Sequence, residues 1–425
     1  MTLSTMTETI LGGKRVLDIT DEKGLICGKQ LGDMGADVIK IERPGGDPAR
    51  NIGPFYNDEI HPEKSLHWFA FNLNKRGVTL DIENEQGKEI FREMVQDADF
   101  VIESFRPGYM EQQGLGYPDL EKINPRIVLV SISPFGQTGP HAQHKASDLT
   151  LMSMAGMVNL CGDPERPPLR MSVSQSYLFG GALCGAMAAH YFREITGQGQ
   201  WVDVSIQQGL IYLTLQAPLM WDLNRINMTR SGSLARFVRR EPDGTVKVVT
   251  GHTKFPTKDG YVEISLAGGP VYGSSTRSLF ELMAETEEIP EELKDKEWEA
   301  MSMATVTQEE LDSLADFTSK YCAKQNTMEL YEETVKRRIM LAPQSTTEQL
   351  LLNPQLNARK FWVEVEHPEL GTTITYPGPW TRFSETPLVF NRRAPLIGEH
   401  NAEIYGSEMG MSEEQLMTLK SNGVI

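Results

Sequence analysis

A loop with two arginines and two adjacent glycines is the first stretch whose residue types suit ligand binding. It reads Arg43-Pro-Gly-Gly-Asp-Pro-Ala-Arg50 and follows the apolar run 36–42. An arginine carries a permanent positive charge and several donors in a fixed plane, which suits a phosphate or a carboxylate. The Gly45-Gly46 pair taken alone also fits an ordinary turn. Two interpretations follow, an anion-binding loop or a plain connection.

The overall charge of the chain limits the class of ligand. With 425 residues and a formal net charge of -17, the chain is strongly acidic. The chain has no overall excess of positive charge to offset its repulsion from nucleic-acid phosphates, so nucleic acid is not the expected partner. A small anionic ligand needs only a local basic pocket and stays possible.

Several other kinds of chemistry lack their motifs. No CxxC or Cys/His ligand spacing occurs, so no metal site is expected and the cysteines are interpreted as reduced thiols of a cytoplasmic protein. No GxGxxG follows the first predicted strand, and no GxxxxGK[ST] occurs. No apolar run reaches about 18 residues, so no membrane span is expected. The four cysteines are Cys27, Cys161, Cys184 and Cys322.

Strand-like and helix-like segments alternate over the first half of the chain. Helices are predicted over 25–35, ended by a glycine, and over 84–97, begun by Asn84. This alternation predicts an α/β fold with a Rossmann-like, doubly wound parallel sheet. Ligands collect at the carboxyl ends of such strands, which favours a binding role for the Arg43–Arg50 loop. The predicted strands are 14–20, 36–42, 78–82, 99–103, 127–132 and 201–206.

The stretch 162–207 joins a proline-rich turn, a run of small residues and a strand. Small residues let a helix approach another backbone closely, so a packed core helix explains the pattern by itself. Its order nevertheless resembles the signature of the family III CoA-transferases, the group of the formyl-CoA transferases and the carnitine and bile-acid CoA-transferases. Matching residues are Arg193, Thr196-Gly197, Gly199-Gln200 and Val202-Asp-Val-Ser205; matching motifs elsewhere include DMGADVIKIERPGGDPAR, FNLNKRGVTLD, ESFRPG, SPFGQTGP, ASDLTLMSMAG and APLIGEHN.

The resemblance implies an architecture that composition does not show. A large CoA-binding domain is expected from residues 1–220 and 336–425, with a smaller α+β domain at 221–335. Two chains are expected to interlock as a dimer. The segment 266–272, with Gly268 and Gly269, is expected to form a mobile lid, although an ordinary loop fits it nearly as well.

The resemblance also exposes a missing group. Counting back from Thr196, the position of the family's nucleophilic aspartate holds Gln175. In the family that carboxylate attacks an acyl-CoA thioester and forms a mixed anhydride, which is nucleophilic catalysis. An amide is neutral and its nitrogen lone pair is delocalised, so Gln175 is not expected to form the anhydride. The acids weighed as substitutes, each also explained as a surface or capping residue, are Asp148, Asp163, Glu165 and Asp203.

Other matching positions imply binding of coenzyme A as a substrate. Ser104, Phe105 and Arg106 match the loop that supports the nucleotide and pantetheine, and Lys145 matches a position near the phosphates. Gln112 stands where relatives often carry a CoA-contacting arginine, which puts full-strength binding in doubt. Each residue alone is equally well explained as solvated surface, but together they favour CoA. Arg43 and Leu80 match positions at the adenine end.

Three hypotheses remain open from sequence. The chain is one subunit of a heteromeric CoA-transferase whose paralogous partner carries the aspartate, or it is self-sufficient with a relocated carboxylate, or it is a non-catalytic acyl-CoA-binding scaffold. The segments 20–24 and 175–177 resemble the Asp-lacking subunits that use succinyl-CoA and benzylsuccinate in anaerobic toluene degradation. Racemisation, also found in the family, is disfavoured because its histidine and aspartate positions hold Ser147 and Gln175. Phe55, Tyr56, Trp68 and Phe69 could line an aromatic-acid pocket or belong to the core.

Overall fold

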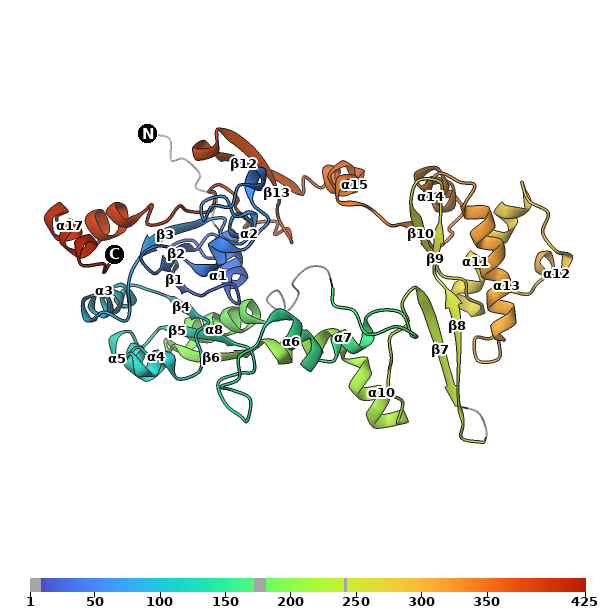
Figure 1. Ribbon diagram of the computed structural model, residues 1–425, viewed down its shortest axis with the longest axis horizontal. Helices are drawn as coiled ribbons and strands as arrows, with labels where there is room; N and C mark the ends of the chain where they lie inside the picture. Colours follow the sequence, from blue (N-terminus) through green and yellow to red (C-terminus); the bar gives the residue numbers. More distant parts are fainter. Residues whose placement is uncertain (1–8, 172–180, 241–242) are drawn as a thin grey trace. The chain divides into compact units, whose positions relative to one another are not determined.

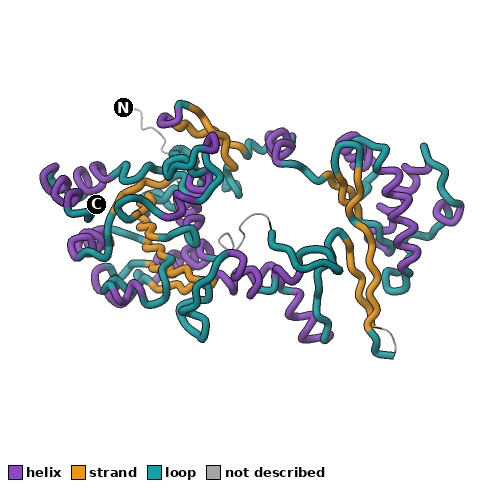
Figure 2. Tube along the Cα trace, in the orientation of Figure 1, coloured by secondary structure: helices purple, strands orange, loops and turns teal. Residues whose placement is uncertain are grey.

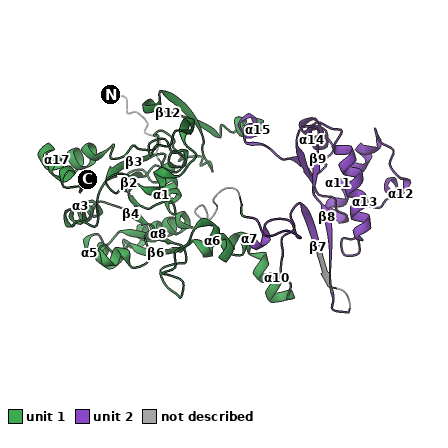
Figure 3. Cartoon of the chain, viewed as in Figure 1, with its two compact units in different colours: residues 1–158, 170–227, 354–425 green, residues 159–169, 228–353 purple. Residues whose placement is uncertain are grey.

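The chain is organised in two compact units, shown in Figure 3. The computed structural model describes residues 9–171, 181–240 and 243–425. Unit 1 takes 1–158, 170–227 and 354–425, and unit 2 takes 159–169 and 228–353. Unit 1 is therefore discontinuous in sequence. Its boundaries fall at 227/228 and 353/354 rather than at 220/221 and 335/336, and the segment 159–169 groups with unit 2.

A six-stranded parallel sheet forms the centre of unit 1 (Figure 1). Its order is β3-β2-β1-β4-β5-β6, and every neighbouring pair is parallel. This is the strand order of a doubly wound Rossmann sheet, as predicted. The strands are β1 (Arg15–Ile19), β2 (Asp37–Glu42), β3 (Lys75–Thr79), β4 (Phe100–Glu103), β5 (Val128–Ser133) and β6 (Gln200–Ser205).

The predicted bounds of β3 were wrong. The strand begins at Lys75 and ends at Thr79, so Leu80 lies just beyond it. Two charged residues enter the strand because each meets a carboxylate of another strand of the sheet, on β1 for Lys75 and on the adjacent β2 for Arg76. Lys75 Nζ lies 2.8 Å from Asp18 Oδ2, and an Arg76 nitrogen lies 2.6 Å from Asp37 Oδ2. Sequence periodicity counts such residues as solvent-facing and so starts the strand too late.

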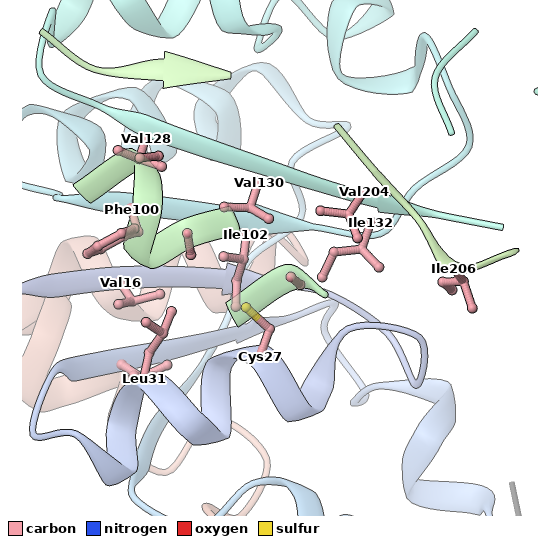
Figure 4. Close-up of a cluster of buried hydrophobic side chains, with 14 of the residues drawn as sticks. Val16, Cys27, Leu31, Phe100, Ile102, Val128, Val130, Ile132, Val204 and Ile206 are labelled. Atoms are coloured by element: carbon pink, nitrogen blue, oxygen red, sulfur yellow. The ribbon is translucent and has the colours of Figure 1, made fainter. Parts of the chain in front are cut away.

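Helices cover both faces of the sheet, as Figure 2 shows for the orange strands of unit 1. On one face, α1 (Leu25–Asp33), α6 (Asp148–Met154), α8 (Ala182–Thr196) and α9 (Ile206–Ile211) pack on Val16, Phe100, Ile102 and their neighbours, drawn in Figure 4. On the other face lie α3 (Glu85–Gln96), α4 (Tyr109–Gln112), α5 (Tyr117–Ile123) and α17 (Glu413–Ser421).

The glycines of the family signature have a structural reason. Gly197 ends α8 with φ +77°, a conformation that other residues rarely adopt. At Gly199 an added Cβ would lie 1.9 Å from the carbonyl oxygen of Ile127. A side chain there would push β6 away from the start of β5. The TG-x-GQ motif therefore turns the chain tightly from helix into edge strand.

The rest of unit 1 consists of short elements and the returning C-terminal segment. The β12–β13 hairpin is antiparallel and buries Val365 and Tyr376 against Trp68 and Phe69. The bounds are η1 (Pro48–Asn51), η2 (Tyr56–Asp58), α2 (Leu66–Phe71), η4 (Tyr212–Thr214), α10 (Gln216–Asn224), α16 (Pro354–Ala358), β12 (Trp362–His367), η5 (Pro368–Leu370), β13 (Thr372–Pro377) and the π-helix η6 (Ala402–Glu408).

Unit 2 is an α+β body with a core of its own. A three-stranded antiparallel sheet, ordered β11-β10-β9, packs its apolar residues with those of α11 and α13. A separate antiparallel hairpin pairs β7 with β8. The bounds are β7 (Leu234–Arg240), β8 (Val246–His252), β9 (Lys254–Pro256), β10 (Tyr261–Ile264), α11 (Gly269–Ala284), α12 (Glu291–Lys294), α13 (Gln308–Cys322), α14 (Thr327–Lys336), β11 (Leu341–Pro343) and α15 (Thr347–Leu352); α7 (Met157–Leu160) lies at the boundary of the two units.

Candidate functional site

A pocket of ≈ 260 Å³ lies where the strand order of the sheet reverses, at the carboxyl ends of β1 to β4. Connections leave β1 and β4 toward opposite faces, so their loops diverge and leave a crevice there. We call it the switch-point pocket. Four residues predicted to bind CoA line it: Arg43, Leu80, Ser104 and Phe105. The other lining residues are Ile19, Thr20, Asp21, Ile41, Glu42, Gly46, Asp47, Pro48 and Ile82.

The loop after β4 is fastened to the loop after β1. The Ser104 hydroxyl donates to Asp21 Oδ1 at 2.7 Å and accepts from the Asp21 backbone N–H at 2.8 Å. The two loops belong to strands on either side of the reversal point. Ser104 thereby ties together two loops that line the pocket.

Arg43 stands at the rim of the pocket within a small polar network. Its guanidinium lies 2.7 Å from Glu83 Oε1, and the Tyr109 hydroxyl donates to the same oxygen at 2.7 Å. Burial tends to lower the pKa of Arg43, but Glu83 and Tyr109 outweigh it and raise the pKa. Burial, then Glu83, raises the pKa of Tyr109 to about 12. Arg43 therefore stays charged and oriented, while its side chain is 60% exposed and open to an anion.

Glu83 and Tyr109 were missed by sequence reasoning. Each looks like an ordinary surface residue, and only the fold brings the loop after β3 to the start of α4. The signal available in sequence was the position of Glu83, which like Arg43 closely follows a strand.

The acids that line the switch-point pocket are paired with cations, which are buried at Glu42 and Asp47 and partly buried at Asp21, the partner of Lys23. Arg50 binds Glu42 through two nitrogens at 2.6 and 2.7 Å, and Lys40 Nζ lies 3.1 Å from Asp47 Oδ2. Buried charges are tolerated when they are paired and hydrogen-bonded in this way. The acids lining this pocket therefore do not create an uncompensated negative field against an anionic ligand.

The other predicted CoA residues lie near the pocket without lining it. Arg106 and Gln112 are exposed and hydrogen-bond to each other. Lys145 is exposed on the loop between β5 and α6. The neighbouring Gln143 Nε2 donates to the Pro107 carbonyl at 3.1 Å, which ties that loop to the loop after β4. The CoA roles of all seven residues stay predictions.

A larger pocket, of ≈ 650 Å³, lies at the carboxyl ends of β5 and β6. We call it the α8 pocket because the first turn of α8 forms one wall. The Thr20–Gly24 loop separates the two pockets: Thr20 and Asp21 line one, Lys23 and Gly24 the other. Its remaining lining residues are Ile26, Cys27, Gln30, Ile132, Gly181, Ala182, Leu183, Cys184, Gly185, Val202, Asp203, Val204, Ser205, Gln208, Gly209, Tyr212 and Leu213.

Gln175 lies outside the described residues, in the segment 172–180 that precedes this pocket wall. Of the acids weighed as substitutes, Asp203 lines the α8 pocket, where both of its carboxylate oxygens accept from the Gln137 backbone N–H at 3.1 Å. Asp148 lies in the first turn of α6, which Ser147 caps. Asp163 and Glu165 belong to unit 2.

The segment expected to act as a lid lies at the start of a helix of unit 2. Gly268 is the N-cap of α11, and Gly269 follows with φ +87°. A Cβ on Gly268 would lie 2.4 Å from the Met301 side chain, so the backbone passes close to that residue. Whether the segment moves over a substrate stays a prediction.

The four aromatic residues considered for an acid pocket divide into two kinds. Trp68 and Phe69 are buried in the cluster beneath β12 and β13. Trp68 also stacks under the Arg50 guanidinium, 3.8 Å from its ring centre, and donates to the Pro395 carbonyl at 3.0 Å. These two belong to the core, whereas Phe55 and Tyr56 are only partly buried.

Within residues 9–171, 181–240 and 243–425, no group of at least three His, Cys, Asp or Glu side chains is arranged to hold a metal ion. None of the helices in that part of the chain is long and apolar enough to cross a bilayer.

Comparison with known proteins agrees with the geometry. The model of the family described as CoA-transferase family III matches residues 11–401. A Thauera aromatica protein named succinyl-CoA:(R)-benzylsuccinate CoA-transferase subunit BbsE is 34% identical over 392 residues, 92% of each chain. Formyl-CoA:oxalate CoA-transferase of Streptomyces coelicolor is 32% identical over 99% of this chain and 100% of its own. The solved structure of a CAIB/BAIF family protein from Brucella suis has a TM-score of 0.78 at 27% identity, covering 94% of this chain and 99% of that one.

Proposed function

The chain belongs to CoA-transferase family III, and from that premise we propose that it is the subunit of a heteromeric CoA-transferase that lacks the nucleophile. The enzyme would move CoA from an acyl-CoA such as succinyl-CoA to an organic carboxylate of the benzylsuccinate type. The observation that supports this proposal most strongly is a neutral residue, Gln175, at the aspartate position of the family signature, whose other residues match. A relative that is itself named a subunit supports the proposal.

The chemistry explains why the missing carboxylate matters. In such a transfer, a carboxylate oxygen attacks the thioester carbonyl, the C–S bond breaks, and CoA leaves as a thiolate. The acceptor carboxylate then attacks the donor acyl carbonyl of this anhydride, so the enzyme's own carboxylate must leave again. The CoA thiolate finally attacks the acceptor carbonyl of the new donor–acceptor anhydride, which forms the acceptor thioester and releases the donor acid as a carboxylate. An amide is a poor nucleophile in the first step. A chain with Gln175 would bind CoA and support the site, while the partner supplies the carboxylate.

The exposed apolar side chains of unit 1 support the proposal of a partner chain. Large apolar side chains on α8, η4 and α10 are exposed: Tyr191, Phe192, Ile195, Tyr212, Leu213, Leu219, Trp221 and Leu223. Monomeric proteins rarely expose extended apolar surface, and a chain that covers these side chains gains hydrophobic free energy. The partner of this proposal is a paralogue that carries an aspartate at the position of Gln175.

The α8 pocket supports the proposed acceptor. Ile26, Leu183, Val202, Tyr212 and Leu213 give it an apolar wall that suits an aromatic or alkyl body. The switch-point pocket would hold the nucleotide end of CoA beside Arg43.

One observation favours a second candidate, the self-sufficient transferase. Asp203 places a carboxylate in the lining of the α8 pocket. For Asp203 to act as the nucleophile, its hydrogen bond from the Gln137 N–H would have to be given up or shared with the reacting group.

The test starts from the native host. The chain is purified under mild conditions, co-purifying proteins are identified by mass spectrometry, and the pure chain and the complex are assayed with succinyl-CoA and benzylsuccinate. We expect activity only in the complex, with a hydroxylamine-trapped acyl adduct on the partner. Activity of the pure chain with an adduct on Asp203 would support the second candidate instead. CoA binding with neither partner nor activity would leave the scaffold hypothesis.

A further inference from the structure

Glu103, the last residue of β4, is a buried carboxylate directly behind the switch-point pocket. It is 4% exposed. Its Oε2 accepts a hydrogen bond of 2.7 Å from the backbone N–H of Phe105, and the Ser131 hydroxyl also bonds to this carboxylate. Ser131 Oγ in turn accepts from the Trp201 indole N–H at 2.9 Å. One chain of hydrogen bonds therefore runs from β6 across β5 and β4 to the pocket loop.

Phe105 links that chain to the residues that face a ligand. It lines the switch-point pocket, and its ring centre lies 4.4 Å from that of Tyr109. Tyr109 donates to Glu83, the partner of Arg43. A change in the path of the Phe105 backbone would therefore alter the pocket wall and the support of Arg43 together.

Burying a carboxylate at position 103 costs folding free energy, because an ionised group loses its water. Among the described residues, no lysine, arginine or histidine lies within ion-pair distance of Glu103, in contrast to Glu42 and Asp47 nearby. Burial, with smaller contributions from Glu111 and Asp21, raises the pKa of Glu103 to about 7, despite the hydrogen bonds from Ser131 and Phe105. Two residues earlier on the same face, Val101 fills the core. An apolar residue would pack at position 103 as well, but it could not accept the Phe105 N–H.

We propose that Glu103 is a positioning residue for the nucleotide half of CoA, which acts by fixing the Phe105 backbone through its acceptor oxygen. Glu103 does not touch the ligand in this proposal; Phe105 and Ser104 do. The inference rests on the proposed binding of CoA at the switch-point pocket.

The test compares two neutral replacements of Glu103, of which only one keeps an acceptor oxygen. Glu103→Gln keeps an oxygen for the Phe105 N–H, whereas Glu103→Leu removes it. Glu111→Gln is the matched control, because it removes a nearby charge from the exposed surface of α4 without touching Phe105. Affinity for CoA and for adenosine 3′,5′-bisphosphate is measured by calorimetry at pH 8, with thermal melting in parallel.

We expect Glu103→Leu to weaken binding of both ligands about tenfold, because the Phe105 N–H loses its partner and the loop shifts. Its melting temperature should not fall, since a buried ionised group has been removed. Glu103→Gln should stay within about threefold of the parent chain, and Glu111→Gln should be unchanged. Weaker binding without lower stability, restored by the conservative variant, is a result that a purely structural role would not produce.

Equal affinity of Glu103→Leu and the parent chain would overturn the inference. So would equal losses in Glu103→Gln and Glu103→Leu. If Glu103→Leu does not fold, Ser131→Ala decides: it removes the hydroxyl that orients the carboxylate and should weaken both ligands about threefold. Unchanged affinity of Ser131→Ala would then overturn the inference. A parent chain that binds neither ligand would instead refute the proposed function.

Discussion

The switch-point pocket and the α8 pocket lie along one edge of the same sheet, but they are built differently. The first is walled by loops that hydrogen bonds and ion pairs hold in place, such as Ser104 on Asp21 and Arg43 on Glu83. The second has small and apolar walls, one of them formed by the first turn of α8. A pocket with preset polar groups suits a ligand part that never changes. An apolar, roomy pocket suits a part that varies between substrates. Under the proposed function, the first pocket would hold the constant nucleotide part of CoA and the second would hold the acceptor.

The sharpest way to break this comparison is to restore a carboxylate at the predicted nucleophile position. Gln175→Asp replaces the missing carboxylate and removes one methylene, so it does not overpack the site. With acyl-CoA, the variant should give an adduct at residue 175 that hydroxylamine or borohydride traps, and the parent chain should give none. Overall turnover is not expected without the partner, because a small misplacement of a nucleophile costs about 10²-fold in rate.

Gln175→Asn is the control for this variant, since it is equally short but neutral. Peptide mapping by mass spectrometry identifies the modified residue. An adduct in the parent chain, or one in Gln175→Asn, would contradict the assignment of roles.

The second prediction concerns how the buried carboxylate of Glu103, behind the switch-point pocket, changes the free energy of unfolding with pH. The pKa of Glu103 is about 7 in the folded chain, above the value of 4.5 for an unperturbed glutamate. The folded state therefore binds more protons than the unfolded state between these values, and stability falls as pH rises. Relative to Glu103→Gln, which does not titrate, the parent chain should lose about 2 kcal/mol between pH 5 and pH 8.

Urea unfolding of the two chains at both pH values checks this prediction. The difference in stability between the parent chain and Glu111→Gln, measured in the same way, serves as the reference because Glu111 is exposed. A stability difference that does not change with pH would show that Glu103 is not ionised by pH 8 or that burial does not control its titration.

The third prediction concerns the rim of the switch-point pocket. Arg43→Ala should weaken CoA binding by about 1–3 kcal/mol, the scale of a hydrogen bond to a charged group. Calorimetry checks the dissociation constant. Arg126→Ala is the matched control, because Arg126 is also an exposed, ion-paired arginine but lies just before β5, at the amino ends of the strands. Equal dissociation constants for Arg43→Ala and the parent would assign Arg43 to the solvated surface.

The smallest expected effect concerns the apolar wall of the α8 pocket and sharpens the comparison between the two pockets. Leu183→Trp places a larger ring in the wall of the α8 pocket and should raise the KM for the acceptor carboxylate about fivefold, roughly 1 kcal/mol. CoA affinity should not change. The assay uses the complex with the partner chain, and Ile60→Trp is the control because Ile60 is highly exposed. A loss of CoA affinity in Leu183→Trp alone would mean that the two pockets do not act separately.

Local patterns in the sequence determined much of unit 1. The apolar runs predicted the strands of the sheet, and Asn84 and Gly35 marked where α3 begins and where α1 gives way to a turn. These features depend on neighbours in sequence, through capping, glycine conformations and hydrophobic periodicity. The motifs identified the family without any coordinates, and the glutamine at position 175 predicted that its nucleophile is missing here.

Tertiary structure decided the features that depend on distant partners. β3 begins at Lys75 because Asp18 and Asp37, far away in sequence, neutralise its charged residues. Trp68 is core and not pocket wall because the returning C-terminal segment covers it. Glu103 looks like one more strand residue until the fold places Phe105 and Ser131 around it. The reason is the same in each case: a charge or an aromatic ring is stable where its partners surround it, and the fold brings those partners from remote parts of the chain.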